Sequence, residues 1–337
     1  MNLRILVVGF GFMGQTHAGN LLRNPQAELA GIVDLEPPIE RLASIKGNRD
    51  TVHLSVEDIC RVPHFVSLET ALTSADADAA IIALPTKHHC NAVLQCLEHG
   101  LHVMVEKPFS ISLKECAEMC RIARGKEKVL AVGYVVRAMK EYQYLRETIH
   151  NGHLGLLRFL SLSRVTGYPA WGNWNDPAFR RASGGALFDL VSHDLDFAEY
   201  CLGDPDDIAI DPILCREFDG NMIQAVLRYP KCNVKIEGGF VSPPNFPFRR
   251  NFTAYFDNGT LCSDCSGEYQ EITSAGIRTE SFPDDDPYYT EVARFIDAIQ
   301  NGDHSGICSG EDGRRSIQVC HRIIDQLTRK PGIKETI

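Results

Sequence analysis

Short apolar runs alternate with helical patterns over about the first 130 residues of the chain. Apolar runs typical of strands cover residues 3–8, 29–33, 79–84, 102–105 and 129–136. Among the helical patterns between them, residues 90–99 give the clearest, and Gly100 is well placed to end that helix in the left-handed conformation. Nearly continuous apolar strands that alternate with helices are typical of a parallel sheet covered on both faces. The pattern therefore predicts a doubly wound, Rossmann-type α/β domain over residues 1–132.

The pattern changes after about residue 140. A helix that carries Tyr144, Leu145 and Ile149 on one face is followed by β-like segments at 156–165, 222–228, 233–240 and 252–256. This order predicts a second, α+β domain with a largely antiparallel open sheet over residues 133–337. Residues 168–181 are expected to form a long loop, and the stretch 46–66 has no clear pattern. A last amphipathic helix over 310–329 is expected to pack back towards the first domain.

Composition and charge narrow the functional classes. A chain of 337 residues is long for one core, which favours roughly two domains. The formal net charge of −10 argues against a nucleic-acid scaffold, and no apolar stretch approaches the roughly 18 residues of a membrane helix. The first apolar run leads directly into glycines without a cleavage pattern, so we interpret it as a strand and not as a signal peptide. The twelve cysteines are scattered, which favours free thiols in a reducing cytoplasm.

A glycine-rich turn follows the first strand and matches the pattern G-x-G-x-x-G. In such a turn the first glycine permits the tight bend, the second lets a pyrophosphate approach, and the third allows close packing of helix on strand. Asp34 ends the second strand, 20 residues after the last glycine, where its carboxylate would accept hydrogen bonds from a ribose 2′-hydroxyl and repel a 2′-phosphate. We therefore expect NAD, with NADP less favoured. The turn consists of Gly9, Phe10, Gly11, Phe12, Met13 and Gly14.

Two further groups of polar residues suggest chemistry on a hydroxyl. Lys107 follows a predicted buried strand, at the sheet edge where ligands bind, and could polarise an oxygen; an ordinary surface lysine is the equally plausible alternative. Asp189 and His193 are four residues apart, so that both lie on one helical face, with Asp196 near it. A carboxylate beside an imidazole suits a general base. Without other evidence, a simple helical Asp–His pair explains the spacing better.

Taken together, these motifs make the chain similar to the family of glucose–fructose oxidoreductase, inositol dehydrogenase and MocA. The glycine turn, the segment 84–89, the tripeptide 106–108, the Asp189–His193 spacing, the segment 132–137 and the start of the last helix carry the resemblance. It implies a catalytic set of Lys107, Asp189 and His193, with His193 as acid/base. It also implies a cis peptide before Pro108, a substrate held between the domains, and a homodimer or homotetramer formed through the second sheet. The residues that the resemblance places along the nicotinamide half of the cofactor site are Leu84, Pro85, His89, Glu106 and Lys107.

The substrate is less sharply indicated than the cofactor. Aromatic and guanidinium groups in the loop suit a sugar, which makes Trp171, Trp174 and Arg180 candidate substrate contacts; a loop used for subunit contact is the equally plausible alternative. The family resemblance adds Arg137 and Asp189 to these candidates. Many relatives have an arginine and an aromatic residue flanking the position of Arg137, where this chain has Val136 and Ala138, which argues against inositol itself as the substrate. No metal site is expected, because the single C-x-x-C at 262–265 has no partner motif.

The sequence thus predicts a dehydrogenase or reductase that uses NAD(P) and acts on a CH–OH group of a sugar, polyol or inositol-like substrate. Two alternatives stay open: an NAD-dependent glycosidase that oxidises its substrate transiently, and a non-enzymatic regulator that senses NAD. Nucleic acid and membrane are not expected as partners.

Overall fold

The computed structural model describes residues 2–44, 54–169, 176–211, 222–241, 243–283 and 285–329. The chain forms two compact units: unit 1 consists of residues 1–135 and 286–314, and unit 2 of residues 136–285 and 315–337. Residues 286–314, which the sequence pattern assigned to the second domain, belong instead to unit 1. The reason is packing, because Val292, Phe295 and Ile296 join the hydrophobic core of unit 1.

Unit 1 contains a sheet of seven strands in the order β15-β6-β5-β4-β1-β2-β3. All neighbouring pairs are parallel except β15 with β6. The order reverses between β1 and β4, and in sheets of this kind ligands bind outside the carboxyl ends of the strands at such a switch point. The strands are β1 (Leu3–Val8), β2 (Ala27–Val33), β3 (His64–Phe65), β4 (Ala79–Ile82), β5 (His102–Glu106), β6 (Leu130–Gly133) and β15 (Cys308–Ser309).

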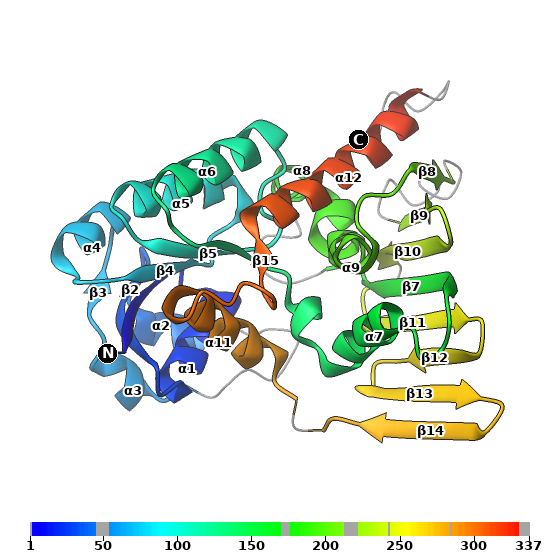
Figure 1. Ribbon diagram of the computed structural model, residues 1–337. Helices are drawn as coiled ribbons and strands as arrows, with labels where there is room; N and C mark the ends of the chain where they lie inside the picture. Colours follow the sequence, from blue (N-terminus) through cyan, green and yellow to red (C-terminus); the bar gives the residue numbers. More distant parts are fainter. Residues whose placement is uncertain are drawn as a thin grey trace. The chain divides into compact units, whose positions relative to one another are not determined.

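Helices cover both faces of this sheet, with α5 and α6 on one face and α1 and α11 on the other (Figure 1). Serine caps begin several of them; Ser112, for example, accepts from the backbone N–H of Glu115 at the start of α6. The doubly wound prediction is therefore confirmed. The helices of unit 1 are α1 (Phe12–Arg23), α2 (Pro38–Ser44), α3 (Val56–Cys60), α4 (Leu68–Ser74), η1 (Thr86–His88), α5 (His89–Glu98), α6 (Leu113–Gly125) and α11 (Pro287–Gln300), and η2 (Val135–Ala138) leads into unit 2.

Unit 2 contains an eight-stranded sheet in the order β14-β13-β12-β11-β7-β10-β9-β8. Among the described strand pairs of this sheet, β7–β10 alone is parallel, which confirms a mostly antiparallel sheet. Along β7, the buried Leu160 and Leu162 alternate with the partly exposed Ser161 and Ser163, because one face of the sheet packs on helices. The strands are β7 (Leu157–Gly167), β8 (Asp207–Ile210), β9 (Met222–Arg228), β10 (Asn233–Val241), β11 (Arg249–Phe256), β12 (Gly259–Ser263), β13 (Glu268–Thr273) and β14 (Gly276–Ser281).

The helices of unit 2 correct two expectations. The segment expected to be a loop contains a short helix, α8 (Pro177–Ala182). Asp189 and His193, which were expected on one face of a regular helix, lie instead where a π-helical segment, η4 (Leu187–Val191), continues into α9 (Ser192–Leu202). Helix α7 (Lys140–Asn151) ends at Gly152, whose φ of 69° is left-handed, as the Asn-Gly pair indicates. The last helix, α12 (Gly310–Arg329), begins in unit 1 and ends in unit 2.

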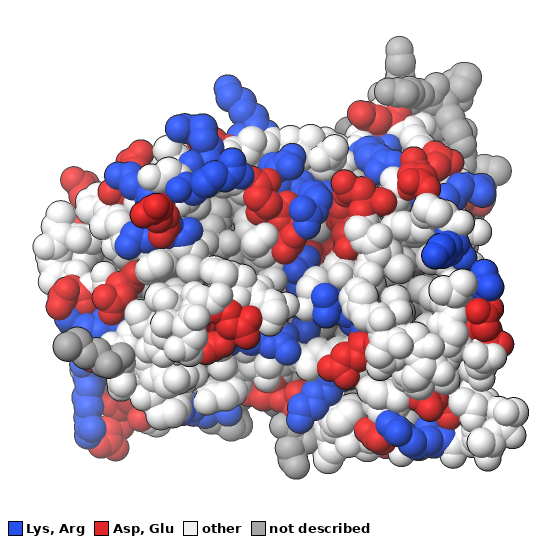
Figure 2. All heavy atoms as spheres, viewed as in Figure 1, with Lys and Arg blue, Asp and Glu red and all other residues white. Residues whose placement is uncertain are grey.

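The charged side chains are mixed in sign. On the face in view, lysine and arginine are interspersed with aspartate and glutamate (Figure 2). Among the described helices, none is both long enough and apolar enough to cross a membrane. The described cysteines are free thiols and not disulfide partners.

Candidate active site

The glycine turn between β1 and α1 has the shape that the fingerprint requires. Gly9 adopts φ +91°, and a Cβ there would lie 2.7 Å from the carbonyl oxygen of Ala83. A Cβ on Gly14 would lie only 1.9 Å from the carbonyl oxygen of Gly9, so helix and turn pack at a distance that only glycine allows. Gly11 differs, because a Cβ built there meets none of the described atoms within 4 Å. The turn is thus closed on the sheet side and open beside Gly11, which fits the approach of a pyrophosphate.

The N-terminus of α1 offers donors to an anion. Gly11 occupies the N-cap position, and none of the described side chains caps the helix there. The first intrahelical bond runs from the N–H of Gln15 to the carbonyl of Gly11, which leaves the backbone N–H groups of Phe12, Met13 and Gly14 for a ligand or water. Together with the helix dipole, these groups suit the phosphates of a dinucleotide. Phe10 has a different role, since its ring lies in the core of unit 1 and its N–H is bound by Asp34.

Asp34 stands just after β2 and is almost fully buried. Its Oδ2 accepts the backbone N–H of Phe10 at 2.7 Å. Its Oδ1 accepts the backbone N–H of Glu36 at 3.1 Å and the Nε of Arg41 at 3.2 Å. The carboxylate is thereby fixed beside the glycine turn, as the fingerprint predicts for a residue that binds ribose hydroxyls. The arginine at this carboxylate was not anticipated from the sequence.

Glu106, at the end of β5, interacts with a histidine that no motif in the sequence indicated. His17 of α1 is fully buried, and its Nε2 lies 2.6 Å from Glu106 Oε1. The other carboxylate oxygen of Glu106 accepts the backbone N–H of Lys107 at 3.2 Å. Gly133 on the next strand leaves room for this carboxylate, since a Cβ there would come within 3.3 Å of it. The only hint in the sequence was the position of His17, three residues after the fingerprint.

His89 connects the ends of two neighbouring strands. Its Nε2 lies 2.7 Å from the carbonyl oxygen of Leu84, after β4, and its Nδ1 lies 3.0 Å from that of Pro108, after β5. Burial lowers the pKa of His89, although both carbonyls and the Glu106 carboxylate favour the protonated ring. The peptide bond between Lys107 and Pro108 is cis, as the family resemblance implied. His89 thus fixes the loops that carry Pro85 and Lys107 at the ligand-binding edge of the sheet.

In unit 2, Asp189 and His193 lie at the junction of the π-helical segment with α9. Asp189 belongs to η4 and is partly exposed, whereas His193 is in the first turn of α9 and is 8% exposed. The Ser192 hydroxyl donates to the carbonyl of Phe188 at 2.6 Å, a local bond that accompanies the irregular turn. Isolated π turns of this kind are frequent at functional sites.

His193 is followed by two aspartates that are engaged in buried ion pairs. Asp194 accepts two hydrogen bonds from Arg164 of β7, at 3.1 and 2.9 Å. Asp196 accepts two from Arg137, at 2.8 and 2.7 Å. Both arginines are more than nine-tenths buried, so the pairs anchor α9 from two sides and help to orient His193. The spacing of Asp196 suggested a place near the catalytic face of the helix. Its pairing with Arg137 instead gives it a role in packing.

Of the five candidate substrate contacts, the structure describes the side chains of Arg137 and Asp189. Arg137 is 4% exposed, and besides its pair with Asp196 its guanidinium lies 4.2 Å from the centroid of the Tyr200 ring. These contacts give it a structural role, which corrects its assignment as a substrate residue. Trp171 and Trp174 lie outside the described residues, and so does the side chain of Arg180. Asp189 remains a candidate substrate contact.

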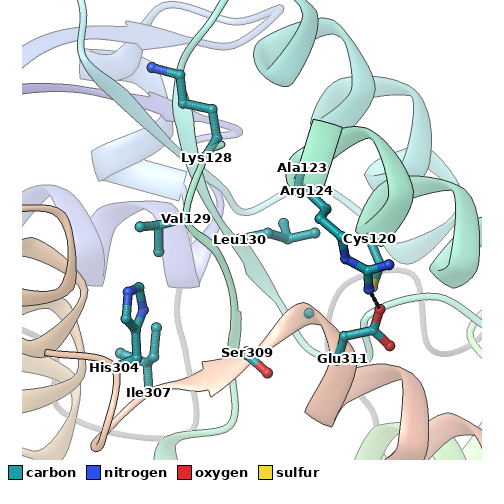
Figure 3. Close-up of a pocket in the computed structure, with 11 residues that line it drawn as sticks. Cys120, Ala123, Arg124, Lys128, Val129, Leu130, His304, Ile307, Ser309 and Glu311 are labelled. Carbon is teal, nitrogen blue, oxygen red and sulfur yellow. Dashed lines mark hydrogen bonds and ion pairs between the residues drawn. The ribbon is translucent and has the colours of Figure 1, made fainter. Parts of the chain in front are cut away.

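The described residues of unit 1 also form a pocket of about 210 Å³ away from the glycine turn (Figure 3). Val129 and Leu130, at the amino end of β6, line it together with Ile307, and Arg124 forms an ion pair with Glu311 beside it. Since the ligand-binding edge of a parallel sheet is the carboxyl edge, this pocket belongs to the opposite edge and is no part of the candidate active site.

The fold and the glycine turn together define the class of the protein as an oxidoreductase with an NAD-binding Rossmann domain. Residues 3–134 match the model of the oxidoreductase family with NAD-binding Rossmann fold, and residues 142–262 match the Gfo/Idh/MocA C-terminal domain. The chain belongs to the Gfo/Idh/MocA oxidoreductase family, as its resemblance indicated.

Individual relatives agree with this assignment. The chain is 24% identical to myo-inositol 2-dehydrogenase of Thermotoga maritima over 98% of each chain. It is 31% identical to D-glucoside 3-dehydrogenase of Escherichia coli, over 60% of this chain and 55% of that protein. An oxidoreductase from Agrobacterium radiobacter, solved with NAD⁺, L-tartaric acid and magnesium, shares the fold with a TM-score of 0.79 at 15% identity, over 98% of this chain and 97% of that one.

Proposed function

We propose that the protein is an NAD-dependent dehydrogenase that oxidises a CH–OH group of a sugar or polyol, or reduces the corresponding carbonyl. The observation that carries the proposal is the glycine turn, open beside Gly11 and flanked by the buried carboxylate of Asp34. The names of the relatives, which act on an inositol and on a glucoside, support the substrate class.

Within this proposal the cofactor is held by unit 1. The backbone of Gly9, Gly11, Phe12, Met13 and Gly14 binds the pyrophosphate, and Asp34 binds the adenosine ribose. The nicotinamide half is bordered by Leu84, Pro85, His89, Glu106 and Lys107. A 2′-phosphate would meet the carboxylates of Asp34 and Glu36, which favours NAD over NADP.

The proposed catalytic set is Lys107, Asp189 and His193. The bound nicotinamide supplies the acceptor or donor of hydride. His193 takes the proton of the reacting hydroxyl, or returns it in the reverse direction, as a general base and acid. The ammonium group of Lys107 binds the same oxygen and stabilises negative charge on it. Asp189 orients the imidazole or binds a neighbouring hydroxyl of the substrate.

We also propose that the protein is a homodimer or homotetramer formed through the face of the unit 2 sheet that the described helices do not cover. The register of the strands aligns five residues in one row across that face, all large and apolar except the threonine: Phe159, Tyr255, Thr260, Ile272 and Ile277. Tyr255 and Ile277 are 48% and 67% exposed, and a row of large apolar side chains on a sheet face suits a second copy of the same surface. Tyr255→Glu should shift the molar mass measured by light scattering towards that of the monomer.

The remaining parts of the proposal concern location and partners. A cytoplasmic location is proposed on the basis of the free cysteines, and the only partner proposed beyond a second copy is the small substrate.

The decisive experiment is a panel of polyols, aldoses, inositols and their keto forms, incubated with NAD or NADH and followed by NADH absorbance, with NADP in parallel. We expect net NADH formation with at least one hydroxyl substrate. Release of an aglycone from a glycoside without net NADH would establish the glycosidase alternative. Tight NAD binding without turnover of any substrate would favour the regulator and refute the dehydrogenase.

A further inference from the structure

We propose that Arg41 determines cofactor specificity: it is a binding residue for the 2′-phosphate of NADP that Asp34 and Glu36 hold in an inactive pairing. This inference rests on the proposed function, because it concerns the ribose end of the same dinucleotide site. It goes beyond the expected role of Asp34, since it assigns a role to a cation that no motif in the sequence indicated.

The position of Arg41 carries the proposal. Its Nε lies 3.2 Å from Asp34 Oδ1 and 3.6 Å from Glu36 Oε2, so one guanidinium serves two carboxylates. The side chain is 30% exposed, and that of Asp34 is 7% exposed, which places the guanidinium where the buried carboxylate meets solvent. A ligand that approaches Asp34 from solvent therefore meets Arg41 as well.

The backbone of Arg41 is tied to the glycine turn. The side-chain amide of Gln15, on α1, donates to the carbonyl of Arg41 and to that of Phe10, both at 3.3 Å. Gln15 is buried, so this bridge joins the last turn of α2 to the fingerprint. The main chain of Arg41 is thus fixed. A change of side-chain rotamer is enough for its guanidinium to reach a new partner.

The acceptor capacity of Asp34 indicates when Arg41 is released. A carboxylate has about four acceptor positions, and three donors already occupy this one: two backbone N–H groups and Arg41. A ribose diol that donates two hydrogen bonds needs two positions. The backbone donors of Phe10 and Glu36 are fixed by the fold, whereas Arg41 is a partly exposed side chain. Binding of NAD should therefore displace Arg41 from Asp34.

The charges explain why the same arginine does not recruit NADP in the native protein. Two carboxylates and one guanidinium leave a formal charge of −1 at this corner of the site, which repels a phosphate. With Asp34 and Glu36 neutralised, the corner carries +1 and presents a planar donor that binds phosphate by paired hydrogen bonds. The choice between NAD and NADP is therefore set by whether Arg41 is paired with these carboxylates or available to a phosphate.

The test measures binding rather than turnover. Calorimetric titration with NAD, NADP and adenosine 2′,5′-bisphosphate is applied to the wild type, to D34S/E36Q, and to D34S/E36Q/R41M. Serine keeps an acceptor for the N–H of Phe10, and methionine keeps the apolar stem of the arginine. We expect D34S/E36Q to bind both 2′-phosphate ligands at least 10-fold more tightly than the wild type, and R41M to abolish that gain. R61M in the same double variant is the matched control, since Arg61 pairs with Glu57 on another helix, and it should keep the gain.

The outcomes separate this inference from the proposed function. If the wild type binds NAD but the double variant gains no affinity for 2′-phosphate ligands, or keeps its gain after R41M, the role of Arg41 is refuted and the dehydrogenase assignment stands. If the wild type binds no dinucleotide at all, both are refuted. R41M alone, a change of a partly exposed side chain, gives a second measurement. It should weaken NADP relative to NAD several-fold, and an unchanged ratio would contradict the inference.

Discussion

Arg164 on β7 and Arg250 on β11 are direct cross-strand partners in the sheet of unit 2. Two like charges opposite one another would weaken the pairing of the strands. Each arginine instead has its own carboxylate, Asp194 of α9 for Arg164 and Glu141 of α7 for Arg250. Carboxylates of the covering helices thus neutralise the two arginines of the sheet. The Arg164–Asp194 pair also fixes α9, which carries His193.

Removing one partner of such a buried ion pair should lower the stability of the fold. We expect Asp194→Asn to destabilise the protein by about 3–5 kcal/mol, because Arg164 would be left buried with an uncompensated charge. Chemical denaturation followed by circular dichroism measures this. Glu57→Gln, which breaks the exposed Arg61–Glu57 pair, is the control and should cost less than about 1 kcal/mol. Equal stability losses in the two variants would contradict the role assigned to the buried pair.

The glycine turn allows a matched pair of substitutions. Gly11→Ala should leave thermal stability nearly unchanged, because a Cβ there meets no atom of the described residues within 4 Å. It should nevertheless abolish most NAD binding, since the methyl group enters the space left for the pyrophosphate. Gly14→Ala should instead destabilise the fold, because its Cβ would lie 1.9 Å from a backbone oxygen. Thermal melts and NAD titrations of both variants check the contrast. Unimpaired NAD binding by Gly11→Ala would refute the proposed position of the cofactor.

His193→Ala should reduce turnover by about 10²–10⁴-fold, the usual contribution of a positioned acid/base group. NAD affinity should stay close to that of the wild type, because the proposed cofactor contacts lie in unit 1. Steady-state kinetics and a separate NAD titration distinguish the two effects. The exposed His304 supplies a control substitution that should change neither quantity. Wild-type turnover in His193→Ala would remove His193 from the catalytic set.

Glu199 on α9 should make the stability of unit 2 depend on pH. Burial, followed by the nearby carboxylates of Asp196 and Asp204, raises the pKa of Glu199 from about 4.5 to about 9. The folded protein then keeps this proton up to about pH 9, whereas the unfolded chain releases it near pH 4.5, so the contribution of Glu199 to stability falls as pH rises between these values.

Glu199→Gln removes the titration and should raise the melting temperature more at pH 8 than at pH 5, by roughly 2–4 °C for each kcal/mol gained. Melting curves of both proteins at the two pH values measure the difference. A constant difference between the variant and the wild type across this range would mean that Glu199 is ionised in the folded protein.

Local patterns were enough for much of this protein. The apolar runs identified the main strands of the Rossmann sheet, and the spacing from Gly14 to Asp34 identified the dinucleotide turn, because both features depend on residues close together in the chain. Gly100 could likewise be assigned as a helix end from its neighbours alone, and its φ is positive. The short strands β12, β13 and β14 escaped notice because they lack a long apolar run.

Contacts between distant segments could not be read from such patterns. Nothing near Arg137 or Asp196 indicates that these two residues pair rather than bind substrate, and nothing near His17 points to Glu106. The same holds for residues 286–314, whose apolar face could have covered either sheet. Each of these partnerships depends on which elements the topology brings together, and many carboxylates and apolar faces compete for each role. The order of residues alone therefore specified the class of fold and the cofactor turn, whereas three-dimensional packing selected the partners of the charged groups around them.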